Sequence, residues 1–504
     1  MYPSSKSLKY LFNSTYLRLI SGLFLLVIYY IFIITLVSEN NDFIIDVSNI
    51  IGPLIFSFLV CRGAYTLLKS SPVTIWTPVV AYLLSSALFF GLGPLVYEFG
   101  NQETQEYLQR HILLSITSLE LLKTNLLNAV GTLSTSGTIF VLSGVKQFQM
   151  PSNNSSNSKH SYKLNLSTVG IFFLALGFIL RYFFILPHQY GLTSYILPGV
   201  VNNLGQLIDL GLTIVAYLAC KQKGPWKIIL LTILPLHGFS TLLEFKKSSL
   251  IISLLLPTLG AYAASGKLKK LSIRILAIAL LYFLSQPYVH YGRDMVEASS
   301  GSKHQATIQQ RYKITKDFFE QGNVRTVINE DSKQSGWTRL SYSGPQSFVM
   351  DEYDSGRPGS TLKDAWIVFV PRILWPSKPV GIGPGKMFYK LATGHDRQAR
   401  VGVTVYGDAY WQGGWVGLVV LSGLMGAVFL LMSRFSLIWI TRGELIYLPS
   451  ILISIQMALL GTTGFFINKI FGALPIYFAY IFAIKMFLVL FIPKRNYQND
   501  FTSA

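Results

Sequence analysis

One segment of the chain combines residue types that can bind an anion and accept a proton. His395, Asp396, Arg397 and Arg400 place an imidazole, a carboxylate and two guanidiniums within six residues. A guanidinium matches the geometry of phosphate oxygens, and a nearby imidazole or carboxylate can take a proton from a hydroxyl. His395, Asp396 and Arg397 are therefore candidate catalytic residues, with Arg400 as a candidate anion ligand. A solvated charged turn is the alternative interpretation.

The same part of the chain is strongly cationic. Between Trp366 and Arg400 six cations stand against one acid, Asp396. The six are Arg372, Lys378, Lys386, Lys390, Arg397 and Arg400. Prolines in PRILWPSKP fix backbone torsions beside Arg372 and Lys378, which makes these two further candidate ligands. The sequence GIGPG at 381–385 allows close backbone approach but lacks the Lys-Ser/Thr ending of a nucleotide-binding loop.

The composition indicates that these residues belong to a membrane protein. Of 504 residues, 51 % are hydrophobic and 13 % are charged, whereas soluble domains carry about 25 % charged residues. Runs of about 20 apolar residues predict an all-α polytopic protein with about 12 transmembrane helices. Their centres lie near residues 28, 60, 86, 133, 177, 207, 235, 256, 281, 423, 454 and 481.

The formal charge of +19 follows the expected topology. Lys and Arg gather in alternate connections, as at Lys267, Lys269 and Lys270, while early opposite connections carry acids such as Asp42 and Glu103. This bias predicts that both termini are cytoplasmic, and nucleic-acid binding is set aside. The predicted parts are residues 1–290 with nine helices, a large extracytoplasmic loop at 291–411, and residues 412–504 with three helices and a short cytoplasmic tail.

The other candidates for ligand binding are cations predicted to lie within a span or on the outer side, because a charge there is costly without a partner. Arg181 falls within the fifth span, and Lys246 and Lys247 lie in an outer hairpin. His290 and Arg293, in YVHYGRD, close the ninth span. Structural roles are the alternatives: Arg181 pairing with Asp209, the lysines pairing with Glu244 or lipid phosphate, and solvation of a helix end.

Two loop segments should lie near the membrane surface. Residues 304–330 space apolar side chains loosely at helical intervals, which predicts an amphipathic helix. Residues 364–376, DAWIVFVPRILWP, are too short to span and too apolar to be freely solvated. No HExxH motif, nucleophile elbow or acidic pair of a soluble nucleotide-sugar transferase occurs. Neither a metal nor another cofactor is therefore expected.

PRILWPSKP, the later YGDAYWQGGWVGLVVLSGLMGAVF and the earlier GLGPLVY resemble segments of Wzy-type O-antigen polymerases. The many-span layout with a late outer loop is also similar. The resemblance implies a GT-C-type glycosyltransferase in the bacterial inner membrane. Such an enzyme transfers a growing glycan from undecaprenyl diphosphate to a sugar hydroxyl of another lipid-linked repeat unit. Implied partners are this lipid-linked oligosaccharide, membrane lipids and a chain-length regulator.

Two other functions fit parts of the sequence. An O-antigen ligase would share the helices and the cationic loop. A flippase or transporter of lipid-linked sugars would show broken helices, mid-membrane charges and repeated halves.

Changing Arg397 or Arg400 to Ala is expected to abolish polymerisation while the protein stays in the membrane. Gel analysis of surface polysaccharide beside an immunoblot of membranes checks this, and full-length polysaccharide at normal expression would contradict it.

Overall fold

The computed structural model describes residues 5–36, 42–145, 165–193, 204–222, 224–300, 306–320, 337–363, 365–370, 375, 377, 383–395 and 401–491. Every regular element within these ranges is helical. Six helical segments are long and apolar enough to cross a membrane: Thr15–Leu36, Asp42–Ser70, Ser118–Gly144, Leu166–Gln189, Thr404–Thr441 and Ile467–Leu488. Four shorter apolar helices are Pro78–Leu92, Trp226–Leu242, Ser249–Ser265 and Leu445–Leu459. The chain is thus an α-helical membrane protein.

Ten of the twelve predicted apolar centres fall on these ten helices, and those near 207 and 281 fall on two other helices, Leu207–Lys221 and Leu268–Ser300. Each centre lies within a helix, and the centre near 207 lies at the first residue of α10 (Leu207–Lys221). The number of spans and the orientation of the termini stay predictions. By packing, the chain divides into two compact units, residues 1–162 with 334–504 and residues 163–333.

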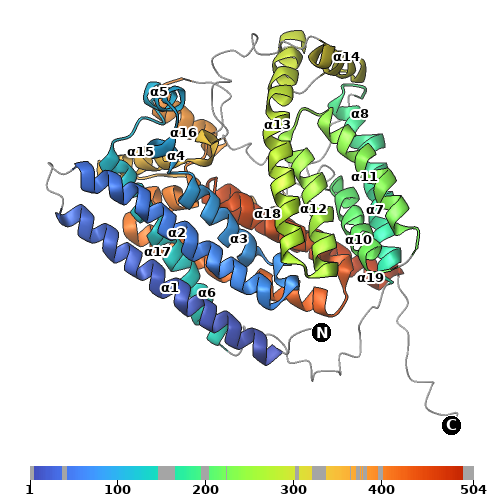
Figure 1. Ribbon diagram of the computed structural model, residues 1–504, viewed down its shortest axis with the longest axis horizontal. Coiled ribbons are helices and arrows are strands. Elements are labelled where there is room, and N and C mark those ends of the chain that lie inside the picture. Colours follow the sequence, from blue (N-terminus) through green and yellow to red (C-terminus); the bar gives the residue numbers. More distant parts are fainter. Residues whose placement is uncertain are drawn as a thin grey trace. The chain divides into compact units, whose positions relative to one another are not determined.

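The first unit is built around four long helices. These are α1 (Ser5–Leu36), α2 (Asp42–Ser70), α6 (Ser118–Gly144) and α17 (Thr404–Thr441). The α6 helix packs against both α1 and α17 (Figure 1). It starts at a capping box, in which Thr117 and Glu120 satisfy each other's backbone amides. The other helices of the unit are α3 (Pro78–Ser86), α4 (Val96–Phe99), α5 (Gln102–Arg110), α15 (Ser343–Asp354), α16 (Pro384–Thr393), α18 (Leu448–Gly461) and α19 (Ala473–Phe491).

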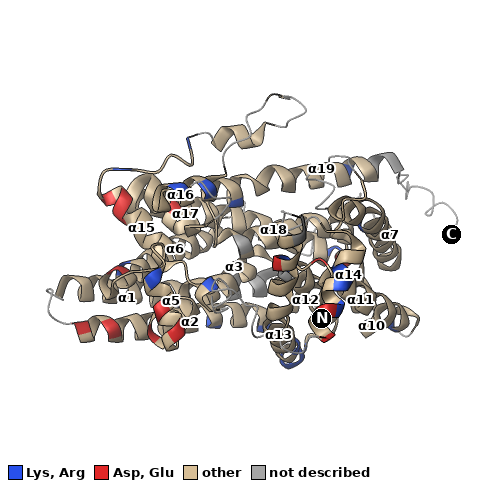
Figure 2. Ribbon diagram, turned by 90° about the horizontal axis from the view of Figure 1, so that it is seen from above, with Lys and Arg blue, Asp and Glu red and all other residues tan. Residues whose placement is uncertain are grey.

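Acidic residues of the first unit gather at one end of its helices. Figure 2 shows them at the start of α2 and on α5. Burial raises the pKa of Glu98, and the nearby carboxylate of Asp46 raises it further. The structure therefore brings together acids from two early connections, which are predicted to lie on the outer side.

The second unit surrounds α10, which packs against α7 (Leu166–Ile179), α11 (Trp226–Leu242) and α12 (Lys247–Ser265). The long α13 (Leu268–Ser300) follows α12 and carries α14 (Ile308–Glu320) near its end (Figure 1). After α7 the chain forms a π-helical turn, Leu180–Ile185, and the short α8 (Leu186–Gln189). Such π-helical turns are rare and often lie at functional sites.

The predicted loop helix is present as α14, within the expected range of 304–330. Ile308, Tyr312 and Phe319 are among its exposed side chains, whereas Arg311 and Ile314 are buried. In the other predicted surface segment, the helical turn Ala365–Phe369 exposes Trp366, whose ring stacks on Trp375 at 6.0 Å between centroids.

Close packing of α6 against α17 gives a stability prediction. An added Cβ at Gly131 would lie 2.5 Å from the ring of Tyr406, which is buried and hydrogen-bonded to Tyr82. Gly137, on the same helix, has open space around it. Gly131→Ala should lower the melting temperature in detergent, whereas Gly137→Ala should leave it equal or raise it through better helix propensity. Equal melting temperatures would contradict this packing.

Candidate functional site

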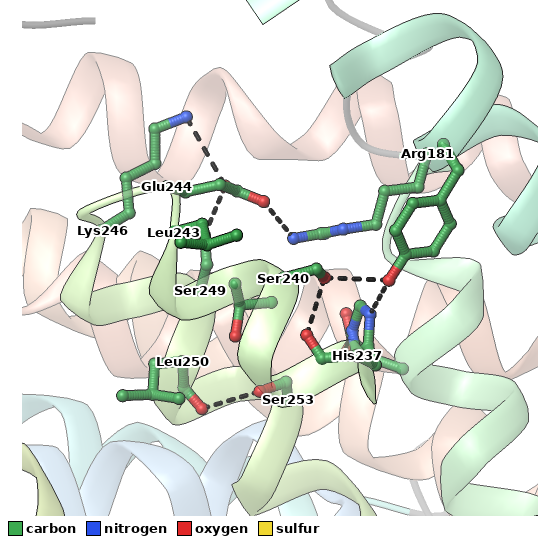
Figure 3. A network of polar contacts seen from close by, with 12 residues as sticks. Arg181, His237, Ser240, Leu243, Glu244, Lys246, Ser249, Leu250 and Ser253 are labelled. Carbon is green, nitrogen blue, oxygen red and sulfur yellow. Dashed lines mark hydrogen bonds and ion pairs between the residues drawn. The ribbon is translucent and has the colours of Figure 1, made fainter. Parts of the chain in front are cut away.

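The turn between α11 and α12 holds a buried carboxylate between two cations. Glu244 forms an ion pair with Arg181, which lies in the π-helical turn after α7. Lys246 Nζ lies 3.8 Å from the other oxygen of Glu244, and the Ser249 hydroxyl lies 3.4 Å from the same oxygen. Figure 3 shows these side chains converging from three segments. The pairing of Lys246 with Glu244, an alternative predicted from the sequence, is present. Arg181 pairs with Glu244 instead of the expected Asp209.

Two more arginines fix the backbone of this turn. Arg293 Nε donates to the carbonyl of Phe245 at 2.9 Å, and Arg311 Nη1 donates to the carbonyl of Leu243 at 3.1 Å. Phe245 has a φ of 52°, a left-handed conformation that is costly for an aromatic residue. An added Cβ at Gly292 would lie 2.2 Å from its ring. The glycine and the two arginines therefore hold a strained turn in place.

Positive charge exceeds negative charge around this turn. Burial lowers the pKa of Lys246; Glu244 opposes this change, and the charges of Arg311, Arg181 and Arg293 add to it. Four cations from four segments thus act on one another, and the Glu244 carboxylate lies among them. An anion arriving here would relieve their mutual repulsion.

A cavity of about 290 Å³ opens beside the turn, and we call it the charged cavity. Its lining residues are Arg181, Ile185, Gln189, Gln206, Asp209, Glu244, Lys246, Ser249 and Ile252. This volume is at the small end of the range for ligand sites. Arg181 is 9 % exposed, and its Nε has no hydrogen-bond partner among the described residues. A buried donor left in this state is costly, so a ligand oxygen in the cavity would stabilise it.

A chain of hydrogen bonds leads away from the cavity wall. Asp209 Oδ1 lies 2.9 Å from His237 Nε2, and His237 Nδ1 lies 3.1 Å from the Tyr182 hydroxyl. That hydroxyl lies 2.8 Å from Ser240 Oγ, which donates to the carbonyl of His237 at 2.7 Å (Figure 3). Asp209 and His237 are buried. The chain joins a carboxylate on the cavity wall to an imidazole behind it.

The first unit holds a second buried carboxylate, Asp408, in the first turns of α17. It accepts hydrogen bonds from the Thr361 hydroxyl at 2.7 Å and the Phe466 amide at 2.8 Å, and Gln412 Nε2 lies 3.3 Å away. Thr361 precedes the cationic segment and Asp408 follows it. The carboxylate therefore ties together the two ends of that segment.

Other contacts also fix the two ends of the cationic segment, around Asp408. The Gly359 amide donates to the carbonyl of Trp411 at 2.8 Å. Thr404 has a φ of 66°, and its hydroxyl accepts from Gln346 at 2.8 Å. The helix breaks at the two glycines of YGDAYWQGGWVG, where Gly414 takes a φ of 58°. These contacts explain why the motif mixes polar, aromatic and glycine residues.

The helix α16 carries part of the cationic segment. Phe388 is fully buried in a cluster with Val349, Val403, Trp411 and Phe465. At 100° per residue, Lys386 and Lys390 share a face and lie opposite Phe388. His395 follows the helix and is exposed. The buried aromatic thus anchors a helix whose other face is cationic.

The predicted site residues therefore separate into three groups. The structure brings Arg181, Lys246 and Arg293 to one turn. His290 is partly buried on α13, Lys247 begins α12, and His395 lies in the other unit. The remaining candidates lie outside the described residues: Arg372, Lys378, Asp396, Arg397 and Arg400.

Several site residues escaped sequence interpretation. Arg311 lies among Gln and Lys in a predicted amphipathic helix, where one more cation does not indicate a buried contact. His237 and Tyr182 lie within apolar runs. A polar residue inside a predicted span is itself an indication of a functional site, and it could have identified them. Asp408 is the acid of YGDAYWQGGWVG, and nothing in the sequence indicates which residues it contacts. Among the described residues, no group of three His, Cys, Asp or Glu side chains could hold a metal ion.

Comparison with protein-family models, with curated proteins and with solved structures finds no match for this chain.

Proposed function

We propose that this protein is a membrane glycosyltransferase that polymerises oligosaccharide repeat units carried on a lipid diphosphate. In this proposal it is a metal-independent enzyme of the GT-C type in the inner membrane of a bacterium, with both termini cytoplasmic. The resemblance of PRILWPSKP and YGDAYWQGGWVG to Wzy-type polymerases supports this reaction and suggests undecaprenyl as the lipid. A separate chain-length regulator is the expected partner.

The observation that carries the proposal is the gathering of cations at the charged cavity. Arg181, Lys246, Arg293 and Arg311 gather around the Glu244 carboxylate, and a buried guanidinium nitrogen of Arg181 has no hydrogen-bond partner among the described residues. In this proposal, the Glu244 carboxylate lies at the position where an anionic substrate group would bind. A diphosphate oxygen has the charge and the acceptor geometry to compete for it.

The reaction needs such cations for a physical reason. The hydroxyl oxygen of the acceptor sugar attacks the anomeric carbon of the donor glycan, and the bond from that carbon to the phosphate oxygen breaks. Its electron pair leaves with the lipid diphosphate, while the hydroxyl proton passes to a base. Negative charge on the diphosphate grows in the transition state, and fixed cations stabilise it there more than in the ground state.

A carrier for lipid-linked sugars is the second candidate. It is favoured by Arg181 and His237, which are buried within apolar helical segments of the second unit, and by Asp209, which is buried on α10. Charges in such positions are common along transport pathways. An O-antigen ligase is the third candidate, and the cationic cavity would serve it equally.

The phenotype of a deletion strain separates these functions. Loss of a polymerase leaves single repeat units attached to lipid A core, whereas loss of a ligase or of a flippase leaves none. We expect single units, with polymer restored by the wild-type gene on a plasmid. Absence of attached repeat units would contradict the polymerase proposal.

A further inference from the structure

A second cavity, of about 180 Å³, lies between α1 and α2 of the first unit, and we call it the helix-pair cavity. The two helices pack side by side (Figure 1). The cavity lies where the start of the apolar segment Thr15–Leu36 meets the later part of Asp42–Ser70. Its lining residues are Thr15, Arg18, Leu19, Leu59, Arg62, Gly63 and Thr66.

The helix-pair cavity is cationic. Arg18 and Arg62 both line it, and none of the described residues that line it is acidic. Neither arginine forms an ion pair within the described part of the chain. The Arg62 guanidinium lies over the Phe58 ring, 6.0 Å from its centroid. Two guanidiniums that share a cavity without a countercharge repel each other, so an anion bound there would be stabilised.

Thr15 adds a hydrogen-bond donor without a partner. The residue is 7 % exposed, and its hydroxyl oxygen has no hydrogen-bond partner among the described residues. A threonine in a helix can donate to the carbonyl four residues earlier, as Thr66 does to Arg62 at 2.8 Å. A buried hydroxyl without such a bond is costly. An anion oxygen in the helix-pair cavity would accept this hydrogen bond.

The surroundings of the helix-pair cavity suit an anion that carries acyl chains. Its volume is below the range of about 300–1,000 Å³ for small-molecule sites, so it accommodates a headgroup and not a whole ligand. Exposed apolar side chains lead away from both arginines at helical spacing, on the same face of each helix. They are Ile51, Ile55 and Phe58 on α2, and Leu25 and Phe32 on α1.

We propose that the helix-pair cavity binds an acidic membrane phospholipid. Arg18 and Arg62 bind the phosphate oxygens, and the Thr15 hydroxyl donates a further hydrogen bond to the phosphate. The acyl chains lie along the exposed apolar side chains of the two helices. Basic pockets between transmembrane helices bind acidic headgroups on the cytoplasmic side, where this end of α1 and α2 is predicted to lie. The lipid would hold the two helices together, and the site does not depend on the proposed reaction.

The test uses full-length protein purified in a neutral detergent and freed of lipid. Native mass spectrometry measures the binding of dioleoylphosphatidylglycerol, and melting temperatures are measured with and without it. Dioleoylphosphatidylcholine has the same acyl chains without a net charge, and inorganic phosphate has no acyl chains.

Three variants accompany the wild type. The double variant Arg18→Gln with Arg62→Gln removes both cations of the helix-pair cavity, and Thr15→Val removes only the unpartnered hydroxyl. The control is Lys270→Gln with Arg274→Gln, which removes the same charge from two exposed side chains of α13.

We expect the wild type and the α13 control to bind one molecule of phosphatidylglycerol with equal affinity, about tenfold more tightly than phosphatidylcholine. The arginine double variant should bind it about tenfold more weakly. Thr15→Val should bind it more weakly and yet melt no lower than the wild type without lipid, because the lost hydroxyl has no partner there. Phosphatidylglycerol should raise the melting temperature of the wild type, whereas inorganic phosphate at the same concentration should not, because it buries no apolar surface.

The contradicting results are equally specific. If the arginine double variant binds phosphatidylglycerol as tightly as the α13 control does, the helix-pair cavity is not the lipid site. Equal binding of the two phospholipids, or equal stabilisation by inorganic phosphate, would overturn an acidic phospholipid as the ligand. If lipid-free Thr15→Val melts below the wild type, its hydroxyl has a structural role and not the proposed role in binding phosphate.

Discussion

Arg181→Met is expected to abolish polymer formation and to lower the free energy of unfolding by about 3–5 kcal/mol, because it leaves Glu244 buried without its ion-pair partner. Glu244 is 7 % exposed, and its second cation, Lys246, lies 3.8 Å away and only partly compensates. Titration with SDS in mixed micelles measures stability, and gel analysis of polysaccharide measures activity.

The double variant Arg181→Met with Glu244→Leu separates the two roles of the arginine. Replacing both members of a buried ion pair with apolar residues is often neutral or stabilising. The double variant should therefore regain stability and still make no polymer, because the anion ligand is absent. Normal polymer in a stable double variant would show that Arg181 has a structural role alone.

Asp408→Ala is expected to lower the free energy of unfolding by about 2–4 kcal/mol, since it leaves the Phe466 amide and the Thr361 hydroxyl as buried donors without an acceptor. Polymer should also be lost, because Asp408 ties the segment that begins after Thr361 to the start of α17. Stability in micelles and limited proteolysis within residues 364–403 measure both effects.

Thr361→Val is the matched control for Asp408→Ala. It removes one of the same hydrogen bonds and keeps the carboxylate, so a loss of about 1 kcal/mol and faster proteolysis are expected. If Asp408→Ala retains the wild-type stability and cleavage pattern, Asp408 does not hold the two ends of this segment together.

Apolar run length predicted the helices well because it is a local property. Each predicted centre lies on a helix, including α10, whose predicted centre coincides with its first residue. Breaks within helices were less visible. The π-helical turn at Leu180–Ile185 has an ordinary apolar composition, so the sequence does not reveal it. In the structure it carries Arg181, which pairs with the distant carboxylate of Glu244.

The cations of the second unit illustrate what sequence can and cannot supply. Arg181, Lys246 and Arg293 stood out because each is costly in its predicted position. Their convergence on one turn depends on contacts between distant residues: the Arg181–Glu244 pair is separated by 63 positions and the Arg293–Phe245 pair by 48. Glu244 was recognised as a neighbour of Lys246, and its stronger partner comes from another helix.

The paired state of His237 was beyond sequence interpretation for the same reason. Its partners come from α10, from the turn after α7 and from its own helix. A histidine in an apolar run is compatible with simple burial. Its contacts with Asp209, Tyr182 and Ser240 become visible only in the folded chain.

The most direct test of the central claim is an assay with purified protein and a synthetic lipid diphosphate-linked repeat unit, without any added metal ion or nucleotide. The polymerase proposal predicts a ladder of lipid-linked products that differ by one repeat unit, with release of free lipid diphosphate. Active, correctly folded protein that leaves the single repeat unit unchanged would contradict it.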